Sequence, residues 1–421
     1  MKIISSGIAL LMMGASASAA DNSTQKSVLT NYANIAEAKY ADSLTTAKRL
    51  QTAVDRLIAS PSATNLAAAK QAWISARVPY QQTEVYRFGN AIVDDWEGKV
   101  NAWPLDEGLI DYVDAAYGGA TDENAVAALN VIANAEFILG GKTVNAMQIT
   151  PTLLENTLQE ADGVEANVAT GYHAIEFLLW GQDLNGHDVG AGARPWTDYA
   201  SAEACTGGNC DRRADYLEAV TELLVSDLAW MTAQWAEGGA ARTEVLAHPG
   251  AGIVAMLTGM GSLSYGEQAG ERMRLGLMLN DPEEEHDCFS DNTHNSHYYD
   301  GLGVQNVYFG SYTRIDGTVV SGASLSDLVS ATNADLDAEM KHKLFTTMKA
   351  LGAIKTAAEA GFSYDQMLER GNQAGEALIM GGVNGLIDQT KSIERIVSAL
   401  DLDGVEFEGS ESLDNPKAVF N

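Results

Sequence analysis

The sequence has few cysteines, few positive charges, no long apolar run after its N-terminus and no common nucleotide or hydrolase motif. Its 26 Lys and Arg against 57 Asp and Glu give a formal net charge of −31, which argues against nucleic acid and anionic membranes as partners. No run approaches 18 uninterrupted apolar residues, so no membrane span is expected. Because GxSxG, Walker A, dinucleotide-binding and HExxH patterns are missing, serine-hydrolase and nucleotide chemistry lack support.

The first 20 residues have the pattern of a secretory signal peptide. Lys2 precedes a largely apolar run, Ile3–Met13, and then the small-residue segment Ala15–Ala20. We expect cleavage after Ala19 or Ala20. The mature protein is therefore expected to be exported, most simply to a bacterial periplasm.

The three cysteines are Cys205, Cys210 and Cys288. Cys205 and Cys210 flank the flexible segment TGGN, and in an oxidising compartment they could close a small disulfide loop. Such a loop contributes roughly 2 kcal/mol to stability. The other two pairings stay open on the sequence alone; our prediction is Cys205–Cys210, with no role assigned to Cys288.

Apolar residues and alanines recur every three or four positions along most of the chain, which predicts an all-α protein. The segment AEGGAAR, residues 236–242, is the expected boundary between two helical-bundle domains, 21–237 and 238–421. Two glycine-rich segments, Gly181–Asp211 and Asp281–Ser324, are predicted to be long ordered loops lining a cleft between the domains. Helices are expected near Val28–Ile58, Ala63–Phe88, Gly108–Tyr117, Glu123–Leu139, Leu153–Glu160, Val168–Trp180, Arg212–Glu237, Arg242–Asn280, Leu325–Ser330, Ala334–Ala360 and Asn372–Leu400.

A weak internal repeat relates the two halves. With an offset of 187 residues, the pattern ExxRxGxxxxD that begins at Glu84 occurs again from Glu271. With an offset of 190, Gly171 falls on Gly361, and the second copy has no histidine or glutamate at the corresponding positions. We therefore predict a duplication in which only the first half keeps its ligands.

The strongest candidate site lies in the stretch GYHAIEFLLWGQDL, which contains His173 and Glu176. Three residues apart on a helix, these side chains share one face and can reach one metal ion. The surrounding residues are apolar, so the carboxylate must be paired, protonated or bound to a cation. The alternative is a partly buried glutamate beside a histidine that satisfies only a backbone group.

Two further segments of the first half carry polar groups that could join this site. Glu84 and Arg87 share a helical face and are expected to pair with each other unless they serve the site. The segment WPLDE, with Trp103, Asp106 and Glu107, looks like a helix entry. Its alternative reading is N-terminal capping and dipole complementation.

The segment EEEHDCFSDNTHNSH, residues 283–297, concentrates three of the seven histidines among acidic groups. His286, His294 and His297, with Asp291, are candidate ligands, because imidazole with carboxylate suits zinc, iron, manganese or copper. The alternative is a surface acidic loop whose histidines cap helices or pack. The 187-residue offset also superimposes this loop on the WPLDE segment, so both could line one cleft.

Together, GYHAIEFLLWGQDL, GARPWTDYA, WPLDEGLIDY and EEEHDCFSDNTH resemble the imelysin-like family, most closely its iron-regulated protein A branch. The resemblance covers nearly the whole mature chain. It implies an all-helical fold of two duplicated bundles with a site between them, in exported proteins linked to bacterial iron uptake. It also gives His173 and Glu176 the metal-ligand role of the family's HxxE motif and Gly171 the place of the GxHxxE glycine.

Our leading hypothesis is a periplasmic protein that binds iron or another divalent metal, with a metal ion or iron complex as ligand. Glu84, Glu107 and His294 are the candidates for a third ligand, and a transport partner in the inner or outer membrane is expected. The alternatives are a zinc metallopeptidase, in which Glu84 or Glu107 activates water, and a peptide- or haem-binding module.

Overall fold

A computed structural model describes residues 10–121 and 124–420, with side-chain surroundings given from residue 22 onward. Most of the described chain is helical, and its strands form two short antiparallel hairpins, so the predicted all-α class is confirmed. The predicted signal peptide, residues 1–20, lies outside the part whose surroundings are described. Export therefore stays a prediction.

The helices and strands differ widely in length. The first half contains α1 (Leu10–Ala59), α2 (Ala63–Gln81), α3 (Ala91–Glu97), α4 (Glu107–Ile110), β1 (Glu136–Leu139), β2 (Lys142–Asn145), α5 (Pro151–Leu153), α6 (Gly171–Trp180) and α7 (Cys210–Trp235). The second half contains α8 (Ala240–Ala247), α9 (Pro249–Ser262), the π-helix η6 (Leu263–Arg274), α10 (Leu275–Leu279), α11 (Thr293–Phe309), β3 (Ser311–Thr313), β4 (Val319–Ser321), α12 (Leu325–Thr332), α13 (Ala334–Glu359), α14 (Tyr364–Leu368), α15 (Gln373–Ala399) and α16 (Glu411–Asp414).

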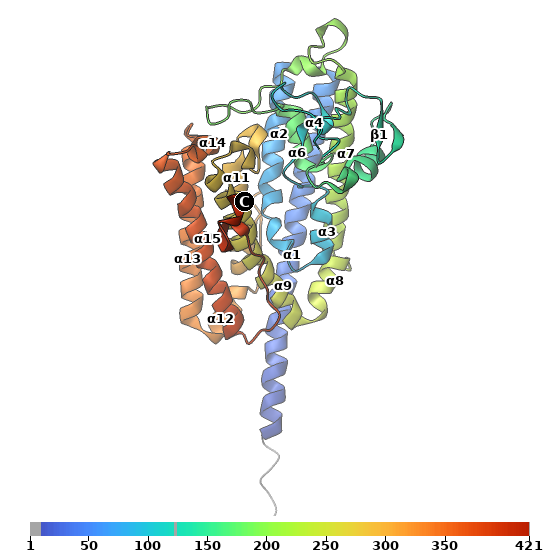
Figure 1. Cartoon of the computed structure of the whole chain (residues 1–421). Coiled ribbons are helices and arrows are strands. Elements are labelled where there is room, and N and C mark those ends of the chain that lie inside the picture. The colour runs from blue at the N-terminus through green and yellow to red at the C-terminus, as the bar shows by residue number, and fades with distance from the viewer. Residues whose placement is uncertain (1–9, 122–123, 421) are drawn as a thin grey trace, which may run out of the picture.

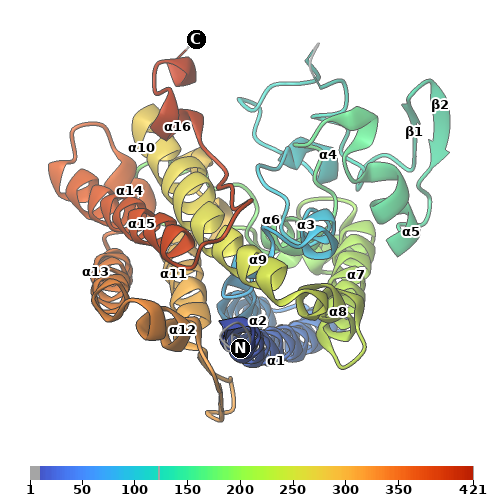
Figure 2. The same ribbon diagram turned by 90° about the horizontal axis from the view of Figure 1, so that it is seen from below.

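The long helices lie side by side in two groups. Helices α1, α2, α6 and α7 form one group and α11, α13 and α15 the other, with α9 crossing between them (Figures 1 and 2). A large apolar core includes buried residues from Val28 to Ile396, and a second core lies around α13, α14 and α15. Because the larger core contains residues from both halves, the division at residue 237 and the duplication stay predictions.

Two predicted helices of the first half are wrong. The helix expected at Gly108–Tyr117 is reduced to α4, and residues 124–135 of the one expected at Glu123–Leu139 form turns before β1. The amides of Asn130, Val131 and Ile132 donate to the carbonyls of residues 108–110 at 2.7, 3.0 and 3.1 Å. Tertiary pairing between these segments overrides the helix propensity of an alanine-rich stretch.

The predicted loop Asp281–Ser324 is also wrong, because it contains the 17-residue helix α11. The buried side of α11 includes His297, Asp300, Gly301 and Gly303. Helix prediction from periodicity searches for apolar residues, and here polar and glycine residues occupy positions that face the protein interior. The single helix expected at Arg242–Asn280 is likewise divided into α8, α9, η6 and α10.

The Cys205–Cys210 disulfide is present, and Cys288 is a free thiol. Within the described residues, no single helix has both the length and the apolar composition of a membrane span. The pair formed by residues 210–247 and 249–279 meets both criteria together, but it is bent by 94°.

Candidate metal centre

Helix α6 lies in the interior, and all ten of its residues are buried. It starts at Gly171, which has φ +81°, and a Cβ there would lie 2.5 Å from the Val100 carbonyl oxygen. The amide of the next residue, Tyr172, donates to that same carbonyl at 2.8 Å. Glycine is therefore required at residue 171 for α6 to start in contact with the segment before the WPLDE sequence.

The His173 ring is held from one side by Glu176. Nδ1 lies 3.0 Å from Glu176 Oε2, and Oε1 accepts from the backbone amide and hydroxyl of Ser290 at 3.0 and 2.6 Å. The two Ser290 donors favour a carboxylate that accepts a hydrogen bond from His173 Nδ1–H. In that tautomer the other ring nitrogen, Nε2, presents a lone pair, and this buried atom has no partner.

Burial and the nearby Arg77 lower the pKa of His173 to about 3, so the imidazole is neutral at ordinary pH. Burial, reinforced by Asp287, raises the pKa of Glu176 well above its usual value, which favours the protonated acid in the metal-free protein. The Ser290 hydrogen bonds oppose that rise, and a cation at His173 Nε2 would favour the carboxylate paired with Nδ1–H. A neutral imidazole with a fixed ring and an unpartnered nitrogen has the form that a metal ligand requires.

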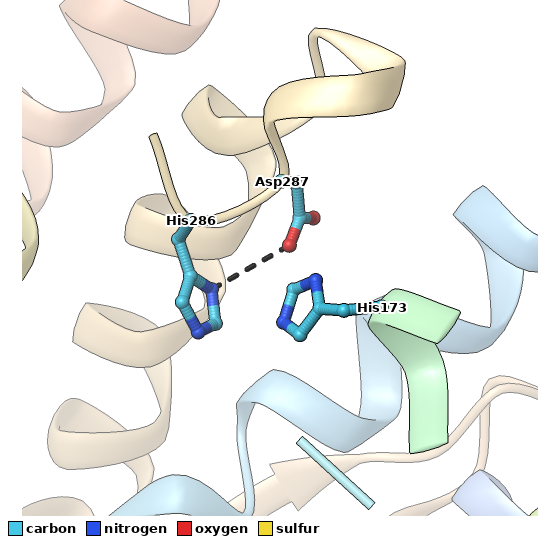
Figure 3. Close-up of side chains that lie close together, drawn as sticks. All are labelled: His173, His286 and Asp287. Atoms are coloured by element: carbon cyan, nitrogen blue, oxygen red, sulfur yellow. Dashed lines mark ion pairs between the residues drawn. The ribbon is translucent and has the colours of Figure 1, made fainter. Parts of the chain in front are cut away.

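His286 and Asp287 complete the group. Their ligand atoms and that of His173 lie within 4.8 Å of one another (Figure 3). The two imidazole rings lie 4.8 Å apart at an interplanar angle of 76°. Figure 3 shows His173 projecting from α6 toward the loop that carries the other two. Two imidazoles and a carboxylate form a donor set that suits iron, zinc or copper.

Arg77 of α2 lies beside this group and neutralises Asp287. Its guanidinium donates to the two Asp287 oxygens at 2.6 and 3.3 Å, and its NH2 group lies 3.3 Å from His286 Nδ1. Asn292 and Ser296 each donate to Asp287 Oδ2 at 2.7 Å. The arginine holds the pKa of Asp287 well below its usual range, whereas burial lowers the pKa of His286.

Glu84 and Arg87 lie outside this group, and the expectation that they pair with each other is wrong. Glu84 binds Arg272 of η6 at 2.8 Å, and Arg87 binds Asp94 at 2.9 Å. Arg272 also binds Asp300 of α11 at 3.2 Å. Glu84 lies in the short 3-10 helix η1 (Glu84–Tyr86) that follows α2, so this ion-pair network connects η1, η6 and α11.

The WPLDE segment lines a pocket of about 390 Å³ next to the site. Its wall includes Trp103, Asp106 and Glu107 of this segment, together with Cys288 and Phe289. The Trp103 ring lies 5.7 Å from the His286 ring, so this pocket extends to the edge of the candidate centre. Asp106 precedes α4 but caps no helix amide; it accepts hydrogen bonds from Tyr117 and Asn124.

The other candidates of the histidine loop lie elsewhere. His297 is fully buried 5.0 Å from the Tyr364 ring, and neither of its ring nitrogens has a hydrogen-bond partner. His294 Nε2 lies 3.1 Å from Asn295 Nδ2. Asp291 belongs to a separate group with Asp183 and Asp365. Of the described residues, those grouped with His173 are therefore His286 and Asp287, and not Glu84, Glu107 or His294.

Asp287, Arg77 and Ser290 were not among the residues predicted from the sequence. Asp287 lies in an acidic run whose carboxylates share one local composition, and from this run we proposed Asp291 instead. Arg77 gave a clearer signal, because it follows Trp73 by four residues and precedes Tyr80 by three on one helix. A charge on an aromatic helix face requires a buried counter-charge.

Comparisons with known proteins agree with the fold. The family model described as Imelysin matches residues 36–393. A protein named iron-regulated protein A from Synechococcus elongatus is 40% identical over 60 residues, which cover 14% of this chain and 17% of that protein. A crystal structure from Parabacteroides distasonis, provisionally named an iron-regulated protein A precursor, has a TM-score of 0.65 at 19% identity. That match covers 90% of this chain and 95% of the other.

Proposed function

The chain belongs to the imelysin family, and on that premise we propose that it is an exported metal-binding protein of bacterial iron uptake. Its site holds one divalent transition metal, iron or zinc, between His173 and His286 with Asp287 as the third group. The observation that carries the proposal is the buried, unpartnered Nε2 of His173, whose ring is fixed by Glu176.

In this proposal Glu176 orients the ligand instead of binding the metal. Its two oxygens are already engaged by His173 Nδ1 and by the Ser290 donors. Metal-bound histidines commonly donate their second ring nitrogen to a carboxylate, which fixes the tautomer and raises ligand basicity. We therefore assign His173 as a metal ligand and Glu176 as the residue that orients its ring.

The charge around the site is compatible with a cation. Arg77 brings one positive charge, and its partner Asp287 brings one negative charge that cancels it. His173 and His286 are neutral because burial lowers the pKa of both. A divalent ion would thus meet the unpartnered Nε2 of His173 and the neutral ring of His286, whose Nδ1 already lies 3.3 Å from Arg77 and 3.4 Å from Gln81.

These contacts favour binding over peptide hydrolysis. A zinc peptidase needs an open coordination position for water and a general base. His173 and Glu176 have side chains that are 1% and 0% exposed, and Glu176 is engaged on both oxygens. The iron context comes from the name of the Synechococcus elongatus relative. A periplasmic location, an iron ion or complex as cargo and a membrane transport partner belong to the same proposal.

The test is a titration of chelator-treated protein with Zn²⁺, and with Fe²⁺ under anaerobic conditions, by calorimetry. We expect one site per chain in the wild type. His173→Ala should weaken binding by at least about 100-fold, because it removes a direct ligand. Removing only the hydrogen-bond partner of a metal ligand typically costs 10–100-fold in affinity. His342→Ala, at an exposed histidine of α13, is the matched control and should bind like the wild type.

Circular dichroism and the thermal midpoint separate a lost ligand from a damaged fold. If His173→Ala binds metal with unchanged stoichiometry and affinity but melts at a much lower temperature, His173 is a core residue and the proposal is wrong. If His173→Ala loses metal binding and keeps its fold, elemental analysis of protein purified without added metal identifies which of iron and zinc the native site carries.

A further inference from the structure

A second group of carboxylates lies on the other side of the histidine loop. Asp183 follows α6, Asp291 precedes α11, and Asp365 lies in α14; one oxygen of each lies within 4.8 Å of the others. Figure 1 shows the segment after α6 extending toward α11 and α14. Oxygen ligands on opposite sides of a Ca²⁺ ion are about 5 Å apart, so this spacing fits one such ion.

Two buried carboxylates in this region lack hydrogen-bond partners. Glu285 is 2% exposed; Thr293 lies close to its carboxylate, but Oε2 has no hydrogen bond of normal geometry. Asp365 is also 2% exposed; Ser363 and the first amides of α14 lie close to its oxygens, but neither oxygen has a hydrogen bond of normal geometry. With Asp183, these two residues line a cavity of about 10 Å³, which is the size for a single small ion or water.

The protein supplies little positive charge to balance these groups. Among the residues that the structure describes, no ion pair joins Asp183, Glu285, Asp291 or Asp365 to a lysine, arginine or histidine. Burial raises the pKa of Asp365, and the hydrogen-bond donors around it and His187 oppose that rise. A proton shared between Asp183 and Asp291 would relieve their repulsion, but it would leave the two buried carboxylates unsatisfied.

We propose that Asp183, Glu285, Asp291 and Asp365 form a second metal site, for one Ca²⁺ ion. All four donors are carboxylates, and they come from three segments: the loop after α6, the loop of residues 285–291, and α14. Ca²⁺ accepts six to eight oxygen ligands in flexible geometry. Mg²⁺ requires near-ideal octahedral geometry and retains water, which a cavity of this size does not accommodate. Cys288 also lines the cavity, but burial raises the pKa of its thiol well above the usual value, which keeps it protonated. The proposed donors are therefore all carboxylates, which separates this set chemically from the His173 site.

The ion has a structural consequence that rests on the proposed function. Glu285 and Asp291 flank His286 and Asp287 in the same loop. A cation bound to both ends of that loop, and to Asp365 of α14, would fix the position of His286 relative to His173. We expect Ca²⁺ to raise the affinity of the His173 site for Zn²⁺, whereas Ca²⁺ binding itself does not require that site.

The experiment is calorimetric titration of chelator-treated full-length protein with CaCl2, combined with thermal unfolding. The wild type should bind one Ca²⁺ with a Kd of about 10⁻⁵ M or lower and melt at a higher temperature with Ca²⁺. Asp365→Asn and Glu285→Gln should each weaken binding by at least tenfold. Asp188→Asn is the matched control, because it makes the same change at an exposed aspartate of the Asp183 loop. His173→Ala should still bind Ca²⁺, which separates this test from that of the proposed function.

Three results would overturn the proposal. One is the absence of both heat and thermal stabilisation at millimolar Ca²⁺ in the wild type. Another is tighter binding of Mg²⁺ or Mn²⁺ than of Ca²⁺. The third is unchanged Ca²⁺ affinity in both Asp365→Asn and Glu285→Gln; if either variant also became more stable without metal, a shared proton would explain the cluster.

Discussion

Replacing Arg77 by methionine should have opposite effects on stability and on metal affinity. The side chain is 1% exposed and its NH2 group lies 2.6 Å from Asp287 Oδ1, so the substitution leaves a buried carboxylate without its counter-charge. Breaking such a pair costs about 3–5 kcal/mol. We expect the unfolding free energy of the metal-free protein to fall by that amount.

The metal affinity should rise, because the same guanidinium lies 3.3 Å from His286 Nδ1 and repels a cation bound there. Two unit positive charges about 5 Å apart repel each other by roughly 3 kcal/mol at an effective dielectric constant of 20. Solvent and structural relaxation reduce this value, so we expect a gain of about ten- to a hundredfold in Zn²⁺ affinity.

Urea unfolding in a chelating buffer measures the first effect, and calorimetric Zn²⁺ titration measures the second. Added Zn²⁺ should restore part of the lost stability, since it binds only the folded form. If Arg77→Met loses metal affinity along with stability, the arginine supports the site instead of opposing the cation. Unchanged stability would refute the assignment of the buried pair as a structural element.

Three further predictions test the site and its surroundings. Glu176→Gln should weaken Zn²⁺ binding by about 10–100-fold with His173 retained, and equal affinity would show that the carboxylate does not orient the ring. Burial lowers the pKa of His297 to about 3, so below about pH 6.5 the unfolded chain binds a proton that the folded chain does not. The free energy of unfolding should therefore fall as pH decreases from about 6.5 toward 4. His297→Leu should make this slope shallower by about 1.4 kcal/mol per pH unit, whereas the control His342→Leu, at an exposed histidine, should not. Urea unfolding across this pH range measures the slope in each variant. Gly171→Ala should lower the free energy of unfolding, measured in urea, by more than about 2 kcal/mol, because the residue has φ +81° and its Cβ would contact a backbone carbonyl. The control Gly119→Ala, where a Cβ meets open space, should have little effect.

The sequence contained enough information for the helical class and the long helices. α7, α13 and α15 lie within two residues of their predicted ends, because each has a clear apolar period. α11 could not be found in this way, since its buried face includes histidine, aspartate and glycine residues. Its position depends on partners in α2, α13 and η6 that are distant in the sequence.

The candidate site was only partly predictable for a related reason. His173 and Glu176 stand out because they interrupt an apolar helix. The choice of His286 over His294 and His297 depends on where a loop places each ring, and all three share the same local composition. Likewise, Glu84 resembled a ligand until its partner Arg272, 188 residues away, was known.

X-ray diffraction from Zn²⁺-loaded crystals, at wavelengths on both sides of the zinc absorption edge, tests the central claim most directly. We predict an anomalous peak bonded to His173 Nε2 and a His286 ring nitrogen, with Glu176 still hydrogen-bonded to His173 Nδ1. A peak bonded to Glu176 in place of His173 would contradict the account. The absence of any zinc peak beside His173, in crystals of protein that binds zinc in solution, would contradict it equally.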